Sequence, residues 1–309
     1  MPGVLRDVGR AFTGEGELTE RQGATLVATA GVVFSITAIV LRAIDSATDW
    51  QVLAYRGAST ALAMALLVGL RRSGRPVRLR DTTWRTVLAG TVLAATSMLY
   101  VLALSRTSAA TTLFLLAAAP VYAAIIGRLV LGEVVPRATR IAIGITAVGI
   151  VVMVGSGLDG GSGVGVLLAA IIPVTIGLYN VIRRADGGAD PVVPALIAGV
   201  VLAVVAGTVA VALDGLAVSL RDGFLACVTG GVALGVGLPL FNLGHTSVAA
   251  AKVSLLLMTE VVLAPLWVWI WPGETPGLGT LIGGAIVLVT VAWLVTRATD
   301  DPDETLLVT

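Results

Sequence analysis

The sequence predicts an all-α membrane protein with ten transmembrane helices in two inverted five-helix repeats. Hydrophobic residues make up 57% of the 309 positions and charged residues 13%, whereas soluble domains average roughly 45–50% and 25%. The mean hydropathy of +0.98 departs from soluble proteins in the same direction. Apolar runs of about 20 residues, the length of helix that crosses a bilayer, recur along the whole chain. These observations exclude a disordered chain, a disulfide scaffold and an ordinary soluble enzyme.

Ten such runs follow one another, and most connections between them are short. The runs are continuous rather than alternating, which excludes a membrane β-barrel. The longest connection is the basic segment 71–85, so no room remains for a soluble domain. The expected spans are 24–44, 50–70, 86–105, 108–131, 137–156, 165–184, 190–213, 223–243, 248–271 and 277–297.

The spans divide the chain into five segments. Residues 1–23 have no apolar core, so we expect a cytosolic tail rather than a signal peptide. The first repeat at 24–156 and the second at 165–297 are joined by a Gly-rich linker at 157–164. The acidic segment 298–309 is expected to form a second cytosolic tail. The linker contains no lysine, which favours a flexible connection over a phosphate-binding loop.

Few residues are available for metal, haem or disulfide chemistry. The single cysteine, Cys227, cannot form an internal disulfide, and the single histidine, His245, excludes a multi-histidine site. The net charge of +1 is too small for the usual basic nucleic-acid binder. We therefore expect no cofactor, no metal and no nucleic acid. The expected partners are the lipid bilayer and a small-molecule substrate, and the protein is expected to be a monomer or a homodimer.

Arginines are distributed unequally between the two ends of the spans, which predicts the orientation. If residues 1–23 are cytoplasmic, 15 arginines lie at the cytoplasmic ends and 3 at the outer ends. Basic residues accumulate on the cytoplasmic side of membrane proteins. We therefore expect a multi-pass protein of the cytoplasmic membrane with both termini in the cytoplasm. The three outer arginines are Arg42, Arg106 and Arg221.

Three tryptophans, Trp267, Trp269 and Trp271, close the ninth span at its expected outer end. Tryptophans are enriched at membrane–water interfaces, so this group is typical of an interfacial anchor. An aromatic cage for a substrate is the alternative interpretation.

The two halves of the chain align with an offset of about 141 residues, which indicates an internal repeat of the kind found in transporters. Because each repeat has five crossings, the second repeat must enter the membrane from the opposite side. Inverted repeats of this kind give secondary transporters a site that opens alternately to each side. The matching segments are 41–45 with 182–186, 104–110 with 243–249 after a two-residue slip, and 131–133 with 272–274.

Several short motifs are similar to those of the drug/metabolite transporter superfamily, specifically its ten-helix members with two EamA-type repeats. The motifs are Tyr55-Arg56, the run 117–133 with Pro120, Tyr122 and Gly132-Glu133, then Gly144 and Gly149, Thr259-Glu260, Pro265 and Gly273-Glu274. The resemblance covers 24–297 and implies transport of small metabolites such as amino acids, amines or drugs. One departure is that Val261 follows Glu260, where second repeats of the family often have proline.

Glu260 lies near the middle of the ninth expected span. Its side chain is too far from either end to reach water, roughly 18 Å at the helical rise. An ionised carboxylate at this depth is costly, so it should face an interior cavity, be paired or be protonated. It is a candidate site for a substrate ammonium or a proton, and a protonated packing residue is the alternative.

Two basic residues also lie within spans. Arg56 is about 9 Å inside the second span, and its guanidinium suits a carboxylate. A structural bond to a neighbouring carbonyl explains Arg56 equally well. Lys252 shares a helix with Glu260 and is close enough to the cytoplasmic end for its side chain to extend into water.

Further polar residues are candidates for a cavity between the two halves. Buried amides cannot stay unpaired in hydrocarbon, so they should face protein or water. Polar contacts between helices are the alternative role. The family resemblance implies lining by the first, third, fourth, sixth, eighth and ninth spans. The candidates are Tyr100, Tyr179, Asn180 and Asn242.

Prolines lie inside four of the expected spans, and each one removes a hydrogen bond and bends its helix. Such bends suit helices that open and close, and fixed curvature is the alternative. The glycine pairs Gly231/Gly235 and Gly279/Gly283 have the spacing of close helix packing. The four prolines are Pro120, Pro173, Pro239 and Pro265.

The function favoured by these features is secondary transport, with export as the favoured direction. The substrate class is a small organic metabolite, amino acid, amine or drug. A scaffold or receptor without flux is the first alternative, and it would not need a carboxylate in mid-membrane. An intramembrane enzyme is disfavoured because the chain carries no HExxH, GxSxG or P-loop motif.

Overall fold

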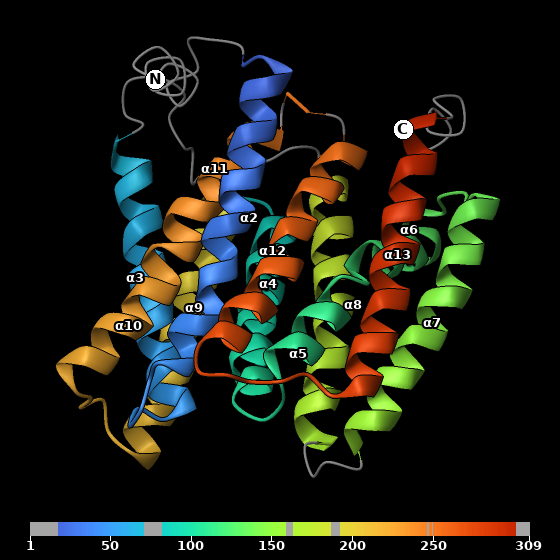
Figure 1. The fold of residues 1–309 in the computed structure, drawn as a ribbon. Helices are drawn as coiled ribbons and strands as arrows, with labels where there is room; N and C mark the ends of the chain where they lie inside the picture. Colours follow the sequence, from blue (N-terminus) through green and yellow to red (C-terminus); the bar gives the residue numbers. More distant parts are fainter. Residues whose placement is uncertain are drawn as a thin grey trace.

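The computed structural model describes residues 18–70, 82–158, 163–186, 192–245, 247–248 and 250–300, and these residues form a helical bundle (Figure 1). Of the expected tails at 1–23 and 298–309, residues 1–17 and 301–309 lie outside the described residues, and so do residues 159–162 of the expected linker at 157–164. The helices are α2 (Glu20–Arg42), α3 (Asp49–Leu70), α4 (Trp84–Leu104), α5 (Ala109–Leu116), α6 (Ala119–Leu131), α7 (Arg137–Leu158), α8 (Gly163–Ala185), α9 (Val192–Leu213), α10 (Leu220–Gly231), the π-helical turn η3 (Ala233–Gly237), α11 (Leu238–His245), α12 (Ala250–Ile270) and α13 (Leu278–Asp300).

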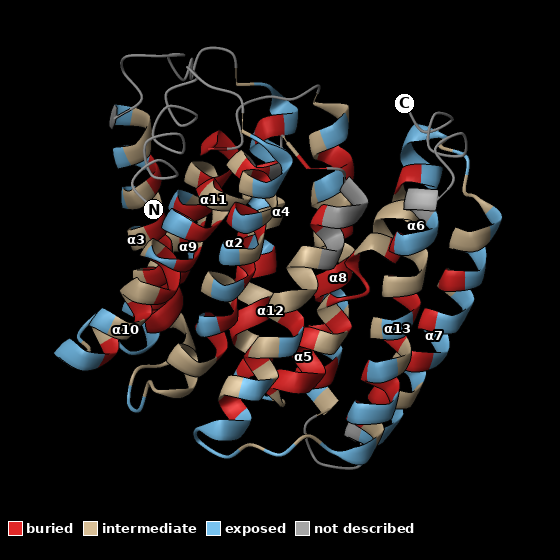
Figure 2. Cartoon of the chain, turned by 45° about the horizontal axis from the view of Figure 1, so that its top comes forward, coloured by how far each residue is buried: buried red, intermediate tan, exposed pale blue. Residues whose placement is uncertain are grey.

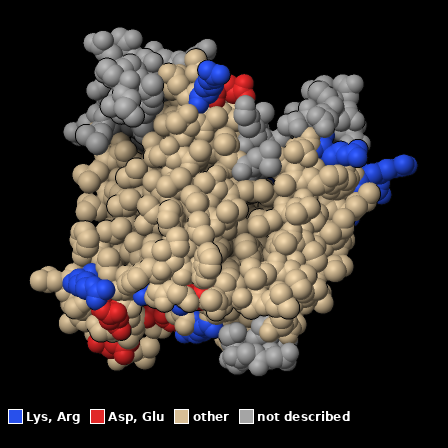
Figure 3. Space-filling model, viewed as in Figure 1, with Lys and Arg blue, Asp and Glu red and all other residues tan. Residues whose placement is uncertain are grey.

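The prediction of an all-α membrane protein is confirmed. Within the described ranges, nine helical stretches are long and apolar enough to cross a bilayer. The apolar part described in α12, Leu256–Ile270, is shorter, although the whole helix has 21 residues. Figure 3 shows charged residues gathered at the two ends of the molecule with an uncharged band between them. Large apolar side chains such as Val151 of α7 and Val289 of α13, each 69% exposed, lie on the outside of the bundle, where lipid can cover them.

Two expected spans are interrupted rather than continuous. The span expected at 108–131 consists of α5 and α6, and Pro120 lies in the first turn of α6. Proline has no N–H to donate, so the regular hydrogen-bond pattern of α5 cannot continue through this position. The span expected at 223–243 consists of α10, η3 and α11, with Pro239 at the second residue of α11. Pro173 and Pro265 instead lie inside the unbroken helices α8 and α12.

Helix α2 begins at Glu20, four residues before the expected span at 24. A capping box explains the difference: the side chain of Thr19 accepts from the Gln22 N–H, and the Gln22 side chain accepts from the Thr19 N–H. Such a reciprocal cap satisfies two donors that a helix start otherwise leaves unpaired. Hydropathy alone does not detect this start because the cap residues are polar.

The two halves of the chain pack mainly against each other. The most extensive helix contacts are α3 with α9, α7 with α13, α2 with α12, and α4 with α8. Each of these pairs joins one helix from before the linker to one from after it. Buried residues lie between the helices and exposed residues on the outside (Figure 2). The core is therefore shared by both halves rather than divided between them.

The packing also agrees with an inverted repeat. Helix α2 starts at the end of the bundle opposite to the start of its counterpart α8 (Figure 1). Exchanging the halves turns the α2–α12 contact into the contact of α8 with α5 and α6, which is also extensive. The same exchange turns α4–α8 into the contact of α2 with α10, η3 and α11.

Glycines allow the central helices to approach closely. A Cβ at Gly57 of α3 would lie 2.9 Å from the Cα of Ala203 in α9, and a Cβ at Gly199 of α9 would lie 3.0 Å from the carbonyl oxygen of Gly57. At the edge of the bundle, a Cβ at Gly283 of α13 would lie 3.1 Å from the Met153 nitrogen in α7. In lipid, helix association depends on such close packing of small residues.

We expect Gly57→Ala to destabilise the protein by about 1–3 kcal/mol, because the added methyl group forces the α3 and α9 backbones apart. Thermal unfolding in detergent measures this effect. Gly144→Ala is the matched control, since no atom lies within 4 Å of its Cβ position. Alanine favours a helix over glycine, so the control should be neutral or stabilising. Equal stability of the two variants would contradict the close α3–α9 contact.

Candidate functional site

Arg56 is buried inside the bundle, although it carries a guanidinium group. It lies on α3, about 10 Å from the helix start at the helical rise, and is 5% exposed. Its Nε donates to the Ser97 Oγ of α4 at 2.9 Å, and its Nη1 donates to the Thr229 carbonyl of α10 at 2.8 Å. The guanidinium therefore joins two helices of the first half to one of the second.

The close approach of α10 to α3 depends on Gly230. A Cβ at this position would lie 2.9 Å from the Arg56 carbonyl carbon, so only glycine leaves enough room. The helix then widens into the π-helical turn η3, in which the Gly237 N–H donates to the Val232 carbonyl at 3.1 Å. Turns of this kind are frequent at functional sites in helices.

Tyr100 lies one turn after Ser97 on α4 and is 6% exposed. Within the described part of the chain, its buried hydroxyl has no hydrogen-bond partner. The hydroxyl is within electrostatic range of Glu260 and Arg56. Buried polar groups in proteins are nearly always satisfied by protein, water or ligand. The Tyr100 hydroxyl is therefore available for a group that binds at this place.

Glu260 lies at the middle of α12, ten residues from either end of the helix. Gly31 of α2 lies against this part of α12, and a Cβ at Gly31 would be in ordinary van der Waals contact, 3.6 Å from the Glu260 nitrogen. The Glu260 side chain is only partly exposed, and its charge interacts with that of Arg56. The structure thus places an acid and a base from different halves near each other. We refer to Arg56, Ser97, Tyr100, Thr229 and Glu260 as the central polar cluster.

Three of the seven candidate residues, Arg56, Tyr100 and Glu260, belong to the central polar cluster. Tyr179 lies on α8 near the charge of Arg183, and Asn180 is exposed on the same helix. The side chains of Asn242 and Lys252 lie outside the described residues.

Residues of the cluster that the sequence did not indicate are Ser97 and Thr229. Ser97 could have been found, because it precedes Tyr100 by three residues and so shares its helix face. Thr229 could not, since it contributes a backbone carbonyl.

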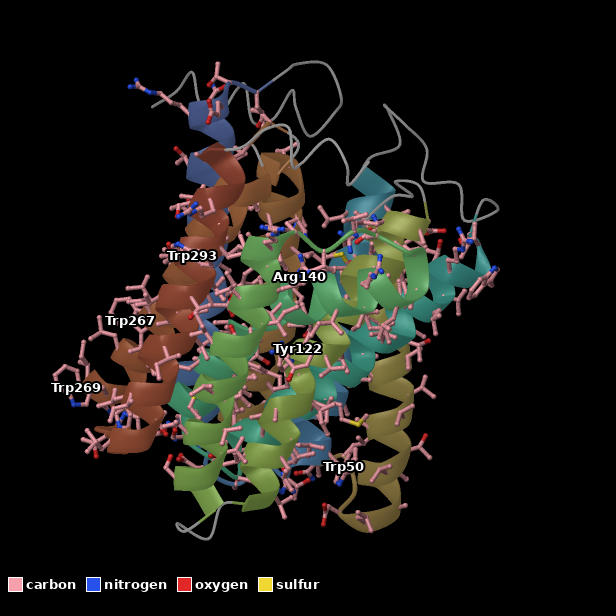
Figure 4. The ribbon with its side chains drawn as sticks, turned by 90° about the vertical axis from the view of Figure 1, so that its right-hand side faces the viewer. Trp50, Tyr122, Arg140, Trp267, Trp269 and Trp293 are labelled. Atoms are coloured by element: carbon pink, nitrogen blue, oxygen red, sulfur yellow. The ribbon has the colours of Figure 1, made fainter. Side chains whose placement is uncertain are left out.

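The three tryptophans of α12 and the turn after it do not act together. Trp269 and Trp271 are 56% and 50% exposed, and Trp269 lies at the rim of the bundle in Figure 4. This position suits the expected interfacial anchor. Trp267 instead faces α2, where its Nε1 donates to the Ser35 Oγ at 3.0 Å. It therefore ties α12 to α2 and is not part of the anchor.

Two spaces are associated with these helices. A small void of about 10 Å³ lies beside Ser97, between α3, α4 and α9, and this is room for about one water molecule. A shallow, open vestibule of about 400 Å³ lies at the end of the bundle and is lined by Arg42, 105–108 and Glu274. Neither is an enclosed chamber of substrate size, so the cavity between the halves stays a prediction.

Comparison with known protein families gives a match in the first half of the chain. The model of the EamA-like transporter family matches residues 21–155, which extend from α2 to α7. These residues are thus similar to an EamA domain. EamA domains belong to the drug/metabolite transporter superfamily, as the sequence motifs indicated.

The fold similarity extends beyond residues 21–155. A solved crystal structure superposes with a TM-score of 0.64 and covers 90% of this chain and 98% of its own, at 19% identity. At this identity the likeness shows a shared fold alone. Comparison with curated proteins gives no match.

The hydrogen bonds of the central polar cluster predict different effects on stability for two conservative substitutions. Ser97→Ala removes the partner of the Arg56 Nε and leaves it unpaired, so we expect a loss of about 1–3 kcal/mol of stability. Tyr100→Phe removes a hydroxyl that has no partner among the described residues, so we expect no loss. Unfolding of both purified variants, without added solutes, measures the difference. A Tyr100→Phe variant as unstable as Ser97→Ala would show that the hydroxyl is paired within the protein.

Proposed function

We propose that this chain is a secondary transporter that moves a small organic solute across the membrane by alternating access. The central polar cluster is its binding site. The observation that carries the proposal is that Arg56 and Glu260, of opposite charge, lie within electrostatic range of each other deep in the bundle. Beside them lies a Tyr100 hydroxyl without a partner among the described residues. The similarity to an EamA domain supports it, since this is a transporter family.

The energetic cost of the cluster supports a binding role. Ionisable residues in mid-membrane are costly and mark substrate or ion pathways. A packing role would require the polar groups to satisfy each other. Here the Arg56 Nε and Nη1 have partners, but the Tyr100 hydroxyl has none among the described residues. A solute would supply the missing partner.

The charges also indicate the chemistry of the solute. A carboxylate such as Glu260 binds an ammonium group, and a guanidinium such as Arg56 binds a carboxylate. A solute with an amine alone would use Glu260 and Tyr100. An amino acid would use Arg56 as well. We therefore propose amines and amino acids as the substrate class, with export from the cytoplasm as the direction.

We further propose that the end of the bundle where α2 starts and α13 finishes is cytoplasmic. Among the described residues, eight arginines lie at this end and three at the other. Each of the three outer arginines is paired with a carboxylate: Arg42 with Glu274, Arg106 with Asp49, and Arg221 with Asp45. The orientation follows from the larger number of arginines at the first end, because basic residues accumulate on the cytoplasmic side. We call the two ends inner and outer accordingly.

We expect Glu260→Gln to impair transport more than folding. The substitution keeps the shape of the side chain and removes a charge-assisted hydrogen bond worth roughly 1.5–3 kcal/mol, which lowers affinity about 10- to 150-fold. A thermal-shift screen of amino acids, amines and cationic drugs on the purified protein identifies a substrate. Flux of that substrate into proteoliposomes, at matched protein incorporation, then compares the variants.

Asp214→Asn is the matched control, because it removes a carboxylate that is exposed in the turn after α9. Its flux should equal that of the wild type. Wild-type flux in Glu260→Gln would reduce Glu260 to a packing residue. Saturable binding without flux in the wild type would favour a receptor, and chemical conversion of the solute would favour an enzyme.

The orientation predicts which loops are accessible in intact cells. In a Cys227→Ala background, Thr275→Cys should react with an impermeant maleimide from outside, because Thr275 is exposed in the outer loop between α12 and α13. Arg128→Cys, exposed at the end of α6, should react only after permeabilisation. The reverse pattern would invert the proposed orientation.

A further inference from the structure

Each end of the bundle carries an ion pair that joins the two halves. At the outer end, Arg42 Nη2 lies 2.9 Å from Glu274 Oε2. At the inner end, Arg184 Nη2 lies 3.3 Å from Glu133 Oε2. Arg42 ends α2, the first helix of its half, and Arg184 lies at the end of α8, the first helix of the other half. Both glutamates lie in the turn after the fourth span of the opposite half. The two pairs are therefore related by exchange of the halves.

Each first helix is also held by a second, stronger contact with the opposite half. At the outer end, the Asp222 carboxylate of α10 binds the turn after α2. It accepts from the nitrogens of Asp45, Ser46 and Ala47 at 3.3, 3.0 and 3.1 Å and from the Ser46 hydroxyl at 2.6 Å. Arg221 adds an ion pair to Asp45. We call this contact the outer clasp.

The inner clasp joins the corresponding elements with the halves exchanged, but here the carboxylate lies in the turn after the first helix and the donors lie on the third span. Asp186, after α8, accepts from the hydroxyls of Thr83 and Thr86 at the start of α4, at 2.6 and 2.7 Å. Arg85 donates to the Ala185 carbonyl. Burial alone would raise the pKa of Asp186, but the two threonine hydroxyls and nearby arginines lower it below its ordinary value of 3.8. Asp186 is therefore ionised at neutral pH, as a strong acceptor should be.

We propose that the two ion pairs are gates that open alternately, Arg42–Glu274 to the outside and Arg184–Glu133 to the inside, while the clasps act as hinges. This inference rests on the proposed transport function. A clasp holds through several hydrogen bonds to one carboxylate. Each gate holds through one ion pair at a partly exposed end, to which the outer gate adds hydrogen bonds at Ala109 and Thr107. An exposed ion pair is weak enough to break in a functional motion. The first helix of each half thus stays with the third span of the other half and separates from its fourth.

Neighbouring backbone groups support both ion pairs. Glu274 Oε1 also accepts from the Ala109 N–H of α5 at 2.7 Å, and Arg42 Nη2 donates to the Thr107 carbonyl at 2.8 Å. At the inner gate, Gly127 of α6 provides space for the ion pair. A Cβ at Gly127 would lie 2.9 Å from Arg184 Nη2 and 3.0 Å from Glu133 Cδ.

The two gates differ in strength. The outer pair is shielded, with both side chains 23% exposed, whereas the inner Arg184 side chain is 45% exposed. Shielded and shorter ion pairs are less weakened by water and salt. The outer gate also has the two additional hydrogen bonds at Ala109 and Thr107. Both gates are closed in this structure, and the inner gate requires less free energy to open. This difference suits entry of the solute from the cytoplasm.

The test measures access to the central polar cluster from each side and needs no substrate. The reporter is Ser97→Cys in a Cys227→Ala background, labelled by an impermeant thiol reagent in sided proteoliposomes. We expect Glu274→Gln to raise labelling from the outside roughly tenfold, the effect of removing about 1.4 kcal/mol of gate stabilisation. Glu133→Gln should raise labelling from the inside instead. Gly127→Ala should act like Glu133→Gln, since it displaces the ion pair without changing any charge.

Asp49→Asn is the matched control, because Asp49 pairs with Arg106 at the same outer end but within one half. It should leave both labelling rates unchanged. The double exchange Arg42→Glu/Glu274→Arg should restore slow labelling from outside, which separates loss of the gate from misfolding. Equal increases from both sides, no change in either gate variant, or an Asp49→Asn effect equal to that of Glu274→Gln would overturn the proposal.

The measurements distinguish failure of the gates from failure of the proposed transport function. Sided labelling without flux of any solute would retain the gates and overturn transport. Flux that depends on Glu260, with labelling unchanged in both gate variants, would retain the transporter and overturn the gates.

Discussion

The need to pair one buried guanidinium organises the centre of this protein. An unpaired charge in mid-membrane is costly, and Arg56 avoids this cost only by reaching a hydroxyl on α4 and a carbonyl on α10. The contact with α10 requires a helix of the other half to approach closely, and Gly230 makes that possible. Tyr100 and Glu260 also lie within electrostatic range of Arg56. Satisfying this one side chain therefore brings polar groups of both halves together.

The overall architecture could be predicted from the sequence because bilayer thickness imposes helix length. Apolar runs gave the fold class, and the odd number of crossings in each repeat gave the inverted orientation. Glu260 and Arg56 could be selected because ionisable residues are conspicuous against an apolar background. The interruptions at Pro120 and at η3 were harder to predict from the sequence. Proline signals a lost hydrogen bond, but whether the helix bends or breaks depends on what packs against it.

The partners of the selected residues could not be predicted for a physical reason. Thr229 contributes a carbonyl, which every residue has, and its availability depends on how α10 meets α3. The pairing of Glu133 with Arg184 likewise depends on the space that Gly127 provides. The repeat alignment places Arg183, not Arg184, opposite Arg42, so sequence offset alone would have named the wrong arginine. Such pairings arise from helix crossing and rotation, which periodicity does not determine.

The α2–α12 interface connects the cluster to the outer end. Along it lie the Gly31–Glu260 contact, the Trp267–Ser35 hydrogen bond and the Arg42–Glu274 ion pair. Arg56 lies on α3, outside this interface. Any separation of α12 from α2 at the outer end must therefore change the position of Glu260 relative to Arg56. A solute held by both residues would bind one arrangement better than the other, and a ligand shifts a conformational equilibrium only through such a difference in affinity. The cluster can thus act as both the binding site and the element that responds to binding.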